Sequence, residues 1–275
     1  MTPSVTRVLA VAVLAGVLAG LATATFHAVA TEPLIEHAIV LEEMKAHSAP
    51  VVPPTSSAPA GAAVAPAPAT DAHSEPVSRA GQRLGLWLGW AGLGIGWGGM
   101  IGSVYFLAAP RLGGFAGRAP RLLLGLAAWW TLALLPSLKY PADPPGVGSP
   151  ETIGLRLQYF LGLELLTALV IAFAIVVAVH LQHRLGHWSG IRGSWLLGAA
   201  IVLAASAAMY LALPANPDEA NVPAALLAGF RTDARIGLGL FWAVFTAAFV
   251  ALPLAGRLRF ATADVGTGST APRAA

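Results

Sequence analysis

Long apolar runs alternate with short polar segments along the whole chain. Six runs are long enough to form a helix that crosses a bilayer, which needs about 20 apolar residues. They cover residues 8–30, 84–109, 122–138, 157–181, 194–213 and 236–255. Periodicity within each run is weak, as is typical of helices that are apolar on all sides. Irregular backbone facing lipid would leave polar groups unpaired, so the pattern predicts an all-α integral membrane protein with about six transmembrane helices.

Composition supports this prediction and excludes several functions. The chain has 275 residues, of which 56% are hydrophobic and 11% are charged, whereas soluble domains carry about 25% charged residues. We therefore expect one membrane domain over residues 1–275, with the lipid bilayer and no nucleic acid as a partner. The absence of Cys excludes zinc–thiolate sites, iron–sulfur clusters and Cys nucleophiles. No phosphate-binding loop, nucleophile elbow or zinc-protease motif is present, so we do not expect an enzyme.

The Lys and Arg residues of the connecting segments predict the orientation. With the N-terminus inside, the inner segments carry nine positive charges and one acid, and the outer segments carry seven positive charges and eleven acids. The positive-inside rule then places both termini in the cytoplasm. The first run ends in Ala28-Val29-Ala30, which resembles a signal-peptidase site. Cleavage there would leave five helices, but the run is longer than a usual signal sequence, so we expect it to be retained.

Two outer segments follow the first run. Residues 48–78 are rich in Pro, Ala and Ser and predict an extended linker. Residues 31–47 read TEPLIEHAIVLEEMKAH and predict a new helix, capped at Thr31 or Glu32. On that helix Glu32, Glu36, Glu43 and His47 form one stripe, and His37 lies off it. Carboxylates and imidazoles suit divalent cations such as Co, Ni, Zn or Mn. An amphipathic helix lying on the membrane surface remains the alternative.

Within the predicted spans, Glu164 is the only carboxylate. A charge at the bilayer centre costs at least about 2.5 kcal/mol, so this residue is a candidate for an ion pathway. A structural lock between two helices is the alternative, with Arg156 near enough in sequence to reach it. The second run carries a row of glycines that predicts a face for close helix packing: Gly81, Gly85, Gly89, Gly92, Gly96 and Gly99.

Three stretches resemble the CbtA family, predicted cobalt transporter subunits of bacteria. They are EPLIEHAIVLEE at 32–43, LPSLKYPADPPGVGSPETIGLR at 135–156, and the last pair of helices with LPANPDE at 213–219 and the segment 230–242. The KYPADPPGVG run is the most specific of these. The loop that contains it is stiffened by prolines, and Tyr140 and Asp143 are its candidate polar contacts.

The resemblance implies a subunit for cobalt uptake in the bacterial inner membrane, linked with cobalamin synthesis and working with a small partner, CbtB. Cobalt(II) would be the transported ion, with no permanently bound cofactor. Members of this family often have several His in the first outer loop, where this chain has His37, His47 and His73. The candidate metal residues are therefore Glu32, Glu36, His37, Glu43, His47 and Glu164.

Two other functions compete with transport. A haem-binding electron carrier needs paired His within the bundle, but only His27 and His180 lie in the predicted spans, near opposite faces of the membrane. A scaffold that holds a partner without transporting is the second alternative, favoured by the glycine row of the second run.

Overall fold

The computed structural model describes residues 4–48, 78–111, 118–185, 188–216 and 221–254. Its elements are all helical: α1 (Val5–Phe26), η1 (His27–Thr31), α2 (Glu32–Ser48), α3 (Arg79–Ala108), η2 (Ala109–Arg111), α4 (Ala119–Trp129), η3 (Trp130–Leu134), α5 (Leu135–Lys139), η4 (Pro150–Thr152), α6 (Ile153–Leu185), α7 (Trp188–Ala212) and α8 (Ala224–Ala251). Six helices in this part of the chain are long and apolar enough to span a membrane, which confirms the predicted fold class. The predicted linker lies almost wholly in 49–77, outside the described residues.

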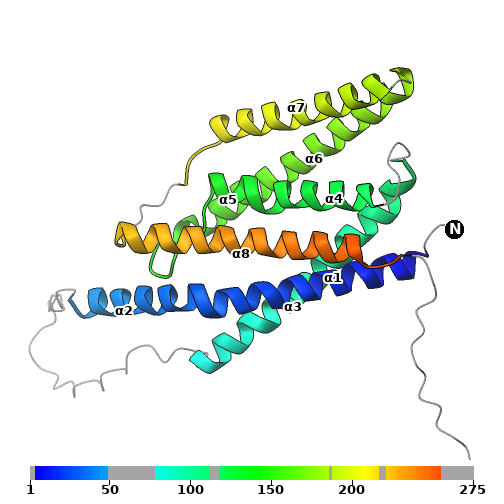
Figure 1. Cartoon of the computed structure of the whole chain (residues 1–275). Helices are drawn as coiled ribbons and strands as arrows, with labels where there is room; N and C mark the ends of the chain where they lie inside the picture. Colours follow the sequence, from blue (N-terminus) through cyan, green and yellow to red (C-terminus); the bar gives the residue numbers. More distant parts are fainter. Residues whose placement is uncertain (1–3, 49–77, 112–117, 186–187, 217–220, 255–275) are drawn as a thin grey trace, which may run out of the picture.

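The six helices that are long enough to span a membrane alternate in direction between two ends of the bundle (Figure 1). One end carries α2, the start of α3 and the start of α8, and we call it the α2 end. The start of α1 and the end of α8 meet at the opposite end, where the Arg7 side chain donates two hydrogen bonds of 3.1 Å to the carbonyl of Pro253. Both ends of the described bundle therefore lie on one side, as an even number of crossings requires.

The tightest contact in the fold is the crossing of α1 and α3. A Cβ atom added to Gly94 of α3 would lie 2.1 Å from the carbonyl oxygen of Gly16 of α1, and one added to Gly20 would lie 2.2 Å from the carbonyl of Trp90. Gly98 and Gly102 continue the contact toward Ala12. Without side chains at these positions the two backbones approach directly, which is how helices gain packing energy in lipid.

The glycine row predicted for close helix packing takes no part in this crossing. Described members of that row have no atom within 4 Å of an added Cβ: Gly85, Gly89, Gly92, Gly96 and Gly99. They lie on another side of α3, because with 3.6 residues per turn these positions point in a different direction around the helix axis from Gly94, Gly98 and Gly102. The α3 helix thus has one glycine face in the core and a second face that no part of the described chain covers.

Helix α8 completes the core with a row of aromatic side chains. Phe241, Phe245 and Phe249 are fully buried at successive turns, and the Trp242 ring packs against Phe241 and Phe245. These rings meet aromatic residues of α3, with Tyr105 edge-on to Phe249 at 5.4 Å. At the end of α8 the buried Arg121 of α4 donates hydrogen bonds to the carbonyls of Phe249 and Leu252. A cation here satisfies carbonyls that a helix C-terminus leaves without partners.

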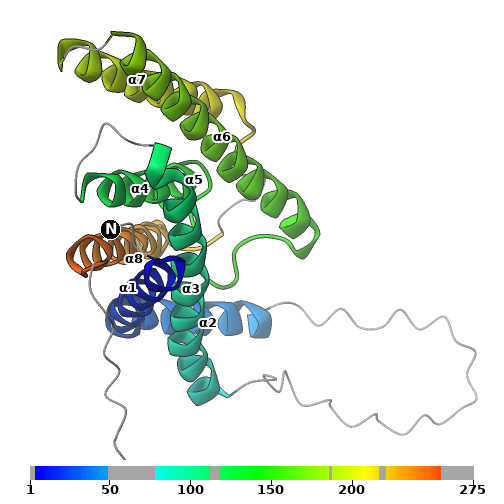
Figure 2. The ribbon, with the colours of Figure 1, turned by 90° about the vertical axis from the view of Figure 1, so that its right-hand side faces the viewer.

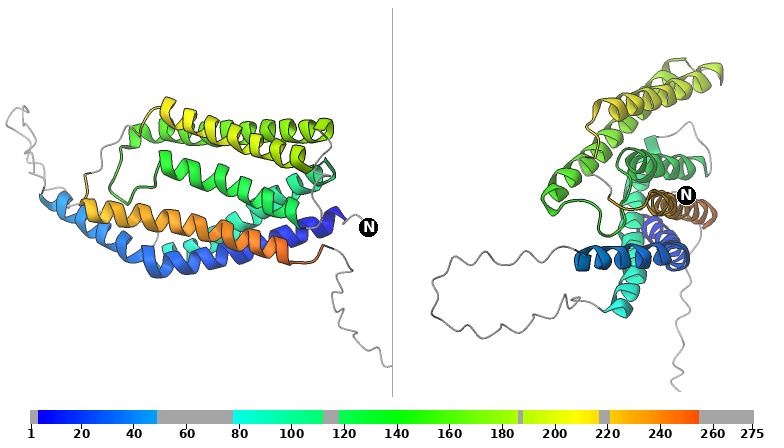
Figure 3. Two further views of the ribbon diagram at one scale, coloured as in Figure 1. Left: turned by 45° about the horizontal axis from the view of Figure 1, so that its top comes forward. Right: turned by 90° about the vertical axis from the view of Figure 1, so that its left-hand side faces the viewer.

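Helices α6 and α7 form a hairpin set apart from α1, α3 and α8 (Figures 2 and 3). Their main contacts are with each other, and fewer reach α5 and η3. Trp130 of η3 donates a hydrogen bond of 3.0 Å to Ser206 of α7, and Lys139 donates one of 2.8 Å to the carbonyl of Tyr210. The short α4–η3–α5 segment therefore links the hairpin to the core.

Two predicted helix boundaries were wrong. The helix predicted to start at Thr31 or Glu32 has no cap there, because α1 continues through a π-turn into α2 as one helix from Val5 to Lys45 and beyond. The last helix begins at Ala224, twelve residues before the predicted span at 236. It therefore includes Asp233, so Glu164 is not the only carboxylate within a helix long enough to cross the membrane.

The α1–α3 crossing gives a test of the fold. We expect Gly94→Ala to lower the thermal midpoint and the membrane abundance, because its methyl group would collide with the backbone of α1. That backbone cannot shift without moving the whole helix. Overpacking of this kind costs about 1–3 kcal/mol. Gly96→Ala is the matched control on the open side of the same helix. Equal midpoints for the two variants in the purified protein would contradict the observed packing.

Candidate functional site

The π-turn at residues 27–31 connects α1 to the acidic helix α2, whose side chains are mostly exposed. Glu32 donates its backbone N–H to the carbonyl of His27, five residues back, which is the bond that defines a π-turn. Pro33 follows directly and has no N–H to donate. The wider turn thus lets the helix continue through a proline. It also lines up Glu32 and Glu36 with the first turns of α3.

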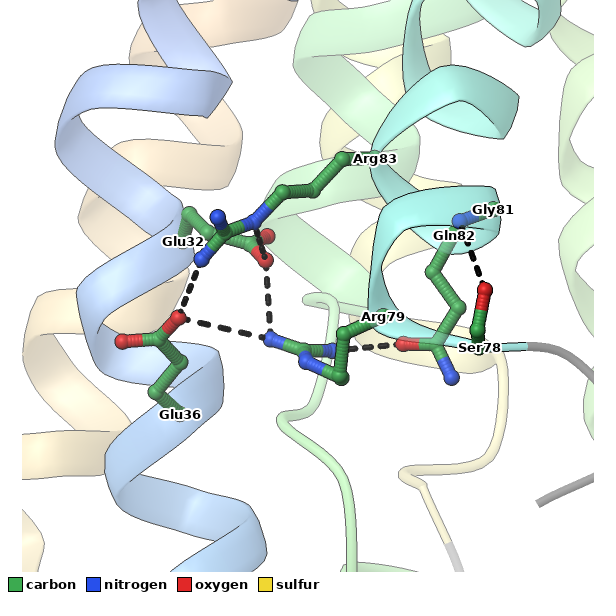
Figure 4. Close-up of polar contacts among 7 residues, drawn as sticks. All are labelled: Glu32, Glu36, Ser78, Arg79, Gly81, Gln82 and Arg83. Atoms are coloured by element: carbon green, nitrogen blue, oxygen red, sulfur yellow. Dashed lines mark hydrogen bonds and ion pairs between the residues drawn. The ribbon is translucent and has the colours of Figure 1, made fainter.

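Two carboxylates of α2 form ion pairs with two arginines of α3 (Figure 4). Arg79 Nη2 lies 2.8 Å from Glu32 Oε1, and Arg83 Nη2 lies 2.6 Å from Glu36 Oε1. The crossed pairs are longer, at 3.7 Å for Arg79 with Glu36 and 3.4 Å for Arg83 with Glu32. Two negative and two positive charges cancel within this cluster. A cation that binds either carboxylate must therefore compete with an arginine.

The other candidate residues of α2 lie on exposed surface. His37 and Glu43 are exposed, and the His47 ring donates one hydrogen bond of 2.8 Å from Nδ1 to the carbonyl of Glu43. Glu42 lies against Gly146 of the loop that follows α5, where an added Cβ would be 3.4 Å from its carboxyl carbon. The structure thus brings Glu43 and His47 into one turn and separates them from the Glu32–Glu36 cluster.

The proline-rich loop after α5 makes the polar contacts expected of it. Asp143 accepts hydrogen bonds from Arg231 of α8, at 2.7 Å from Nη2 and 3.2 Å from Nε, and from Asn216 at 3.2 Å. The Asp143 side chain is only 8% exposed. Tyr140 donates a hydrogen bond of 3.0 Å to the carbonyl of Pro214. The loop therefore joins the KYPADPPG and LPAN stretches, which lie far apart in the sequence.

A pocket of about 310 Å³ opens beside this loop at the α2 end. Its walls include Tyr140, Asp143 and Asn216 together with Arg156 and Phe160 of α6. The burial of Tyr140 raises the pKa of its hydroxyl above the usual value, which keeps the group neutral. The pocket thus combines a paired carboxylate, a cation, a phenol and an amide.

Glu164 lies one turn deeper on the same face of α6. Arg156, Phe160 and Glu164 are spaced by four residues, so they follow one another down the helix. Glu164 is partly buried, and within the described residues its carboxylate has no ion pair or hydrogen bond. The pairing with Arg156 that the sequence allowed is therefore not formed. A carboxylate without a partner at this depth is a stronger candidate for ion handling than a paired one.

Two polar groups near the α2 end were missed as site residues. His27 lies inside the π-turn, where its ring packs on Trp90 of α3 and against Gly237 of α8, and Asp233 lies one turn from that glycine. The sequence did offer a signal for them, because both residues lie in or beside stretches that resemble the CbtA family. His27 precedes the EPLIEH stretch, and Asp233 falls in the 230–242 segment. The boundary placed at 236 left Asp233 outside its helix.

Across the described ranges, no group of three or more His, Asp or Glu is close enough to hold a metal ion. The six candidate residues thus do not form one compact site in this structure. They lie instead along two routes from the α2 end: the surface of α2, and the α6 face that leads to Glu164.

One known protein family matches almost the entire described chain. Residues 5–253, from the start of α1 to just beyond α8, match the family described as probable cobalt transporter subunit (CbtA). The chain belongs to the CbtA family. No curated protein and no solved structure matches it. The family description names a transporter subunit for cobalt, which agrees with the six helices that are long and apolar enough to span a membrane.

The ion-pair cluster between α2 and α3 gives a second prediction. We expect Glu32→Gln to lower the free energy of unfolding by about 1 kcal/mol and Glu36→Gln to lower it less, because the Glu32 side chain is 14% exposed and that of Glu36 is 50% exposed. Chemical or thermal unfolding of the purified protein measures both. A larger effect at Glu36 would contradict the assignment of Glu32 as the more buried partner.

Proposed function

We propose that this CbtA protein is the membrane subunit of a bacterial importer for divalent cobalt that supplies cobalamin synthesis. It acts in the inner membrane as a transport subunit rather than an enzyme, with a small membrane partner of the CbtB type and no permanently bound cofactor. The match of the CbtA family to every membrane-spanning helix is the observation that carries the proposal.

Charge asymmetry gives the orientation in this proposal. Both termini lie in the cytoplasm, and the α2 end faces outward. The exposed side chains of His37, Glu43 and His47 then collect cations at the outer surface, where negative charge raises their local concentration. Glu32 and Glu36 take part only when an incoming cation displaces their arginines.

From the outer surface, the ion reaches Glu164 by way of the pocket beside the KYPADPPG loop. A bare divalent charge cannot pass through apolar helices, so it needs oxygen ligands at each depth. The α6 face offers the pocket first and the Glu164 carboxylate one turn below it. Selection of cobalt over nickel or copper has to come from geometry or supply, because cobalt binds oxygen and nitrogen ligands less tightly than either.

A scaffold without transport activity is the second candidate function. The uncovered glycine face of α3 favours it, since Gly85, Gly89 and Gly92 leave room for a further helix at close range. In that case the partner subunit provides the ion path, and this chain only holds it in the membrane.

Uptake of radioactive cobalt separates the two functions. In a strain that lacks other cobalt importers, we expect expression of this chain with its partner to restore uptake, and expression of the partner alone to fail. If the partner alone restores full uptake, the transport proposal is wrong, because the ion path then lies in the partner. Haem absorption in the purified protein would contradict both.

Glu164 offers the sharpest test of the ion path. We expect Glu164→Gln to reduce cobalt uptake at least tenfold at unchanged membrane abundance, because the amide keeps the shape of the side chain and removes its charge. Glu151→Gln is the matched control, since that acid is exposed and lies outside the α6 face. Normal uptake by Glu164→Gln at wild-type abundance would exclude Glu164 from the path.

A further inference from the structure

His27 lies where α1, α3 and α8 meet, and its ring is held from several sides. The imidazole stacks on Trp90 of α3 at 5.3 Å between ring centres, with an angle of 18° between the planes. Phe26 packs edge-on at 5.4 Å. The ring also lies against Gly237 of α8, where an added Cβ would come within 2.2 Å of Nε2. Gly237 is thus the residue that leaves space for an imidazole at this junction.

The hydrogen bonds of this ring leave one nitrogen available. Nδ1 lies 2.8 Å from Thr31 Oγ1, one turn along the π-helix. Within the described residues Nε2 has no hydrogen-bond partner. Histidines that ligate metals commonly use one nitrogen for the metal and hold the other by a hydrogen bond to an oxygen, which fixes the ring. His27 has this arrangement on the protein side.

Asp233 adds a negative charge at the same junction. It precedes Gly237 by four residues, so it lies one turn away on the same face of α8. His27 lies within the electrostatic range of this carboxylate, and in the described part of the chain Asp233 forms no ion pair or hydrogen bond. The nearby cation Arg231 is taken by Asp143. A partly buried carboxylate with no counter-ion among the described residues thus lies one turn from the glycine against which the His27 ring packs. Together with the imidazole nitrogen that has no partner, it is suited to a divalent cation.

We propose that His27 and Asp233 form a transient binding site for the divalent cation at the α1–α3–α8 junction. This inference rests on the proposed transport of cobalt, and it adds a site outside the six residues considered from the sequence. Imidazole nitrogen together with carboxylate oxygen suits Co²⁺ and its neighbours in the transition series. Two protein ligands leave the other positions of the ion to water. Such a site binds weakly enough to release its ion, which transport requires.

The π-turn fits this role. Turns of this kind are rare and occur often at functional sites in helices. Here the turn widens the helix at the residue whose side chain enters the junction and places Thr31 beside the ring. It thus serves two purposes, because it also carries the chain past Pro33.

The test combines cobalt binding with uptake. Equilibrium dialysis of Co²⁺ against the purified full chain, without a His-tag, gives the dissociation constant. We expect His27→Gln and Asp233→Asn each to raise it at least tenfold and to reduce uptake to a similar extent, at wild-type abundance and thermal midpoint. Thr31→Val should raise it about tenfold, the usual effect of removing a hydrogen bond that orients a ligand.

Gly237→Ala provides an independent arm, because its methyl group would displace the ring without removing a ligand. We expect the same loss of cobalt binding, whereas Gly239→Ala, where nothing lies within 4 Å of the added methyl, should bind as the wild type does. If Gly237→Ala fails to reach the membrane, the His27 and Asp233 variants decide the result.

The outcomes separate this inference from the proposed function. Wild-type binding and uptake in both His27→Gln and Asp233→Asn would overturn the site and leave cobalt transport standing. A lower midpoint in His27→Gln with unchanged cobalt affinity in Asp233→Asn would also overturn it, because it would show a packing role only. If the wild type transports no cobalt, transport is wrong, and the dialysis result alone decides whether His27 ligates the ion.

Discussion

The fold depends on the direct backbone contact between α1 and α3. In lipid, apolar side chains gain little by leaving one apolar surface for another, so helices associate through close packing. Gly16 and Gly20 on α1 and Gly94 and Gly98 on α3 remove the side chains that would keep the helices apart. The contact fixes the positions of the turns of both helices at the α2 end. It thereby sets Trp90 against His27 and brings the arginines of α3 within reach of the carboxylates of α2.

Two prolines of the chain are each preceded by a π-turn. Pro33 and Pro136 each follow a residue whose N–H reaches five residues back, to His27 and Trp130 respectively. In both cases a π-turn replaces the hydrogen bond that proline cannot make. The first turn carries an acidic helix beyond the core. The second is followed by the KYPADPPG loop, which folds back on α8 through Asp143 and Arg231. A π-turn therefore connects a membrane helix to a polar segment in both places, to α2 in the first and to the KYPADPPG loop in the second.

Apolar run length predicted the six helices and the alternating topology, because lipid leaves the backbone few alternatives. It could not predict which glycines pack, since two rows on α3 have similar spacing and only the partner helix distinguishes them. It missed the continuous first helix because a proline after a capping residue is also the usual start of a helix. The stripe on α2 followed from helix geometry, yet the arginines that pair with half of it lie 47 residues away in sequence, across the linker. Asp233 was missed because hydropathy falls near Arg231 and Arg235, whereas α8 includes these charges in its first turns.

The acidic residues of the described chain differ in whether a cation is paired with them. Charges that hold the structure are paired: Glu32 and Glu36 with arginines, and Asp143 with Arg231. Glu164 and Asp233 are different, since both lie within long apolar helices and neither has a counter-ion among the described residues. A carboxylate left this way destabilises the protein unless a proton, water or a cation accompanies it. A transporter needs such groups to be unsatisfied when the cargo is absent, because a carboxylate already held by arginine offers an incoming ion little gain. In the proposed import, the paired acids therefore shape the mouth of the protein, and the unpaired ones lie where a divalent cation would gain most.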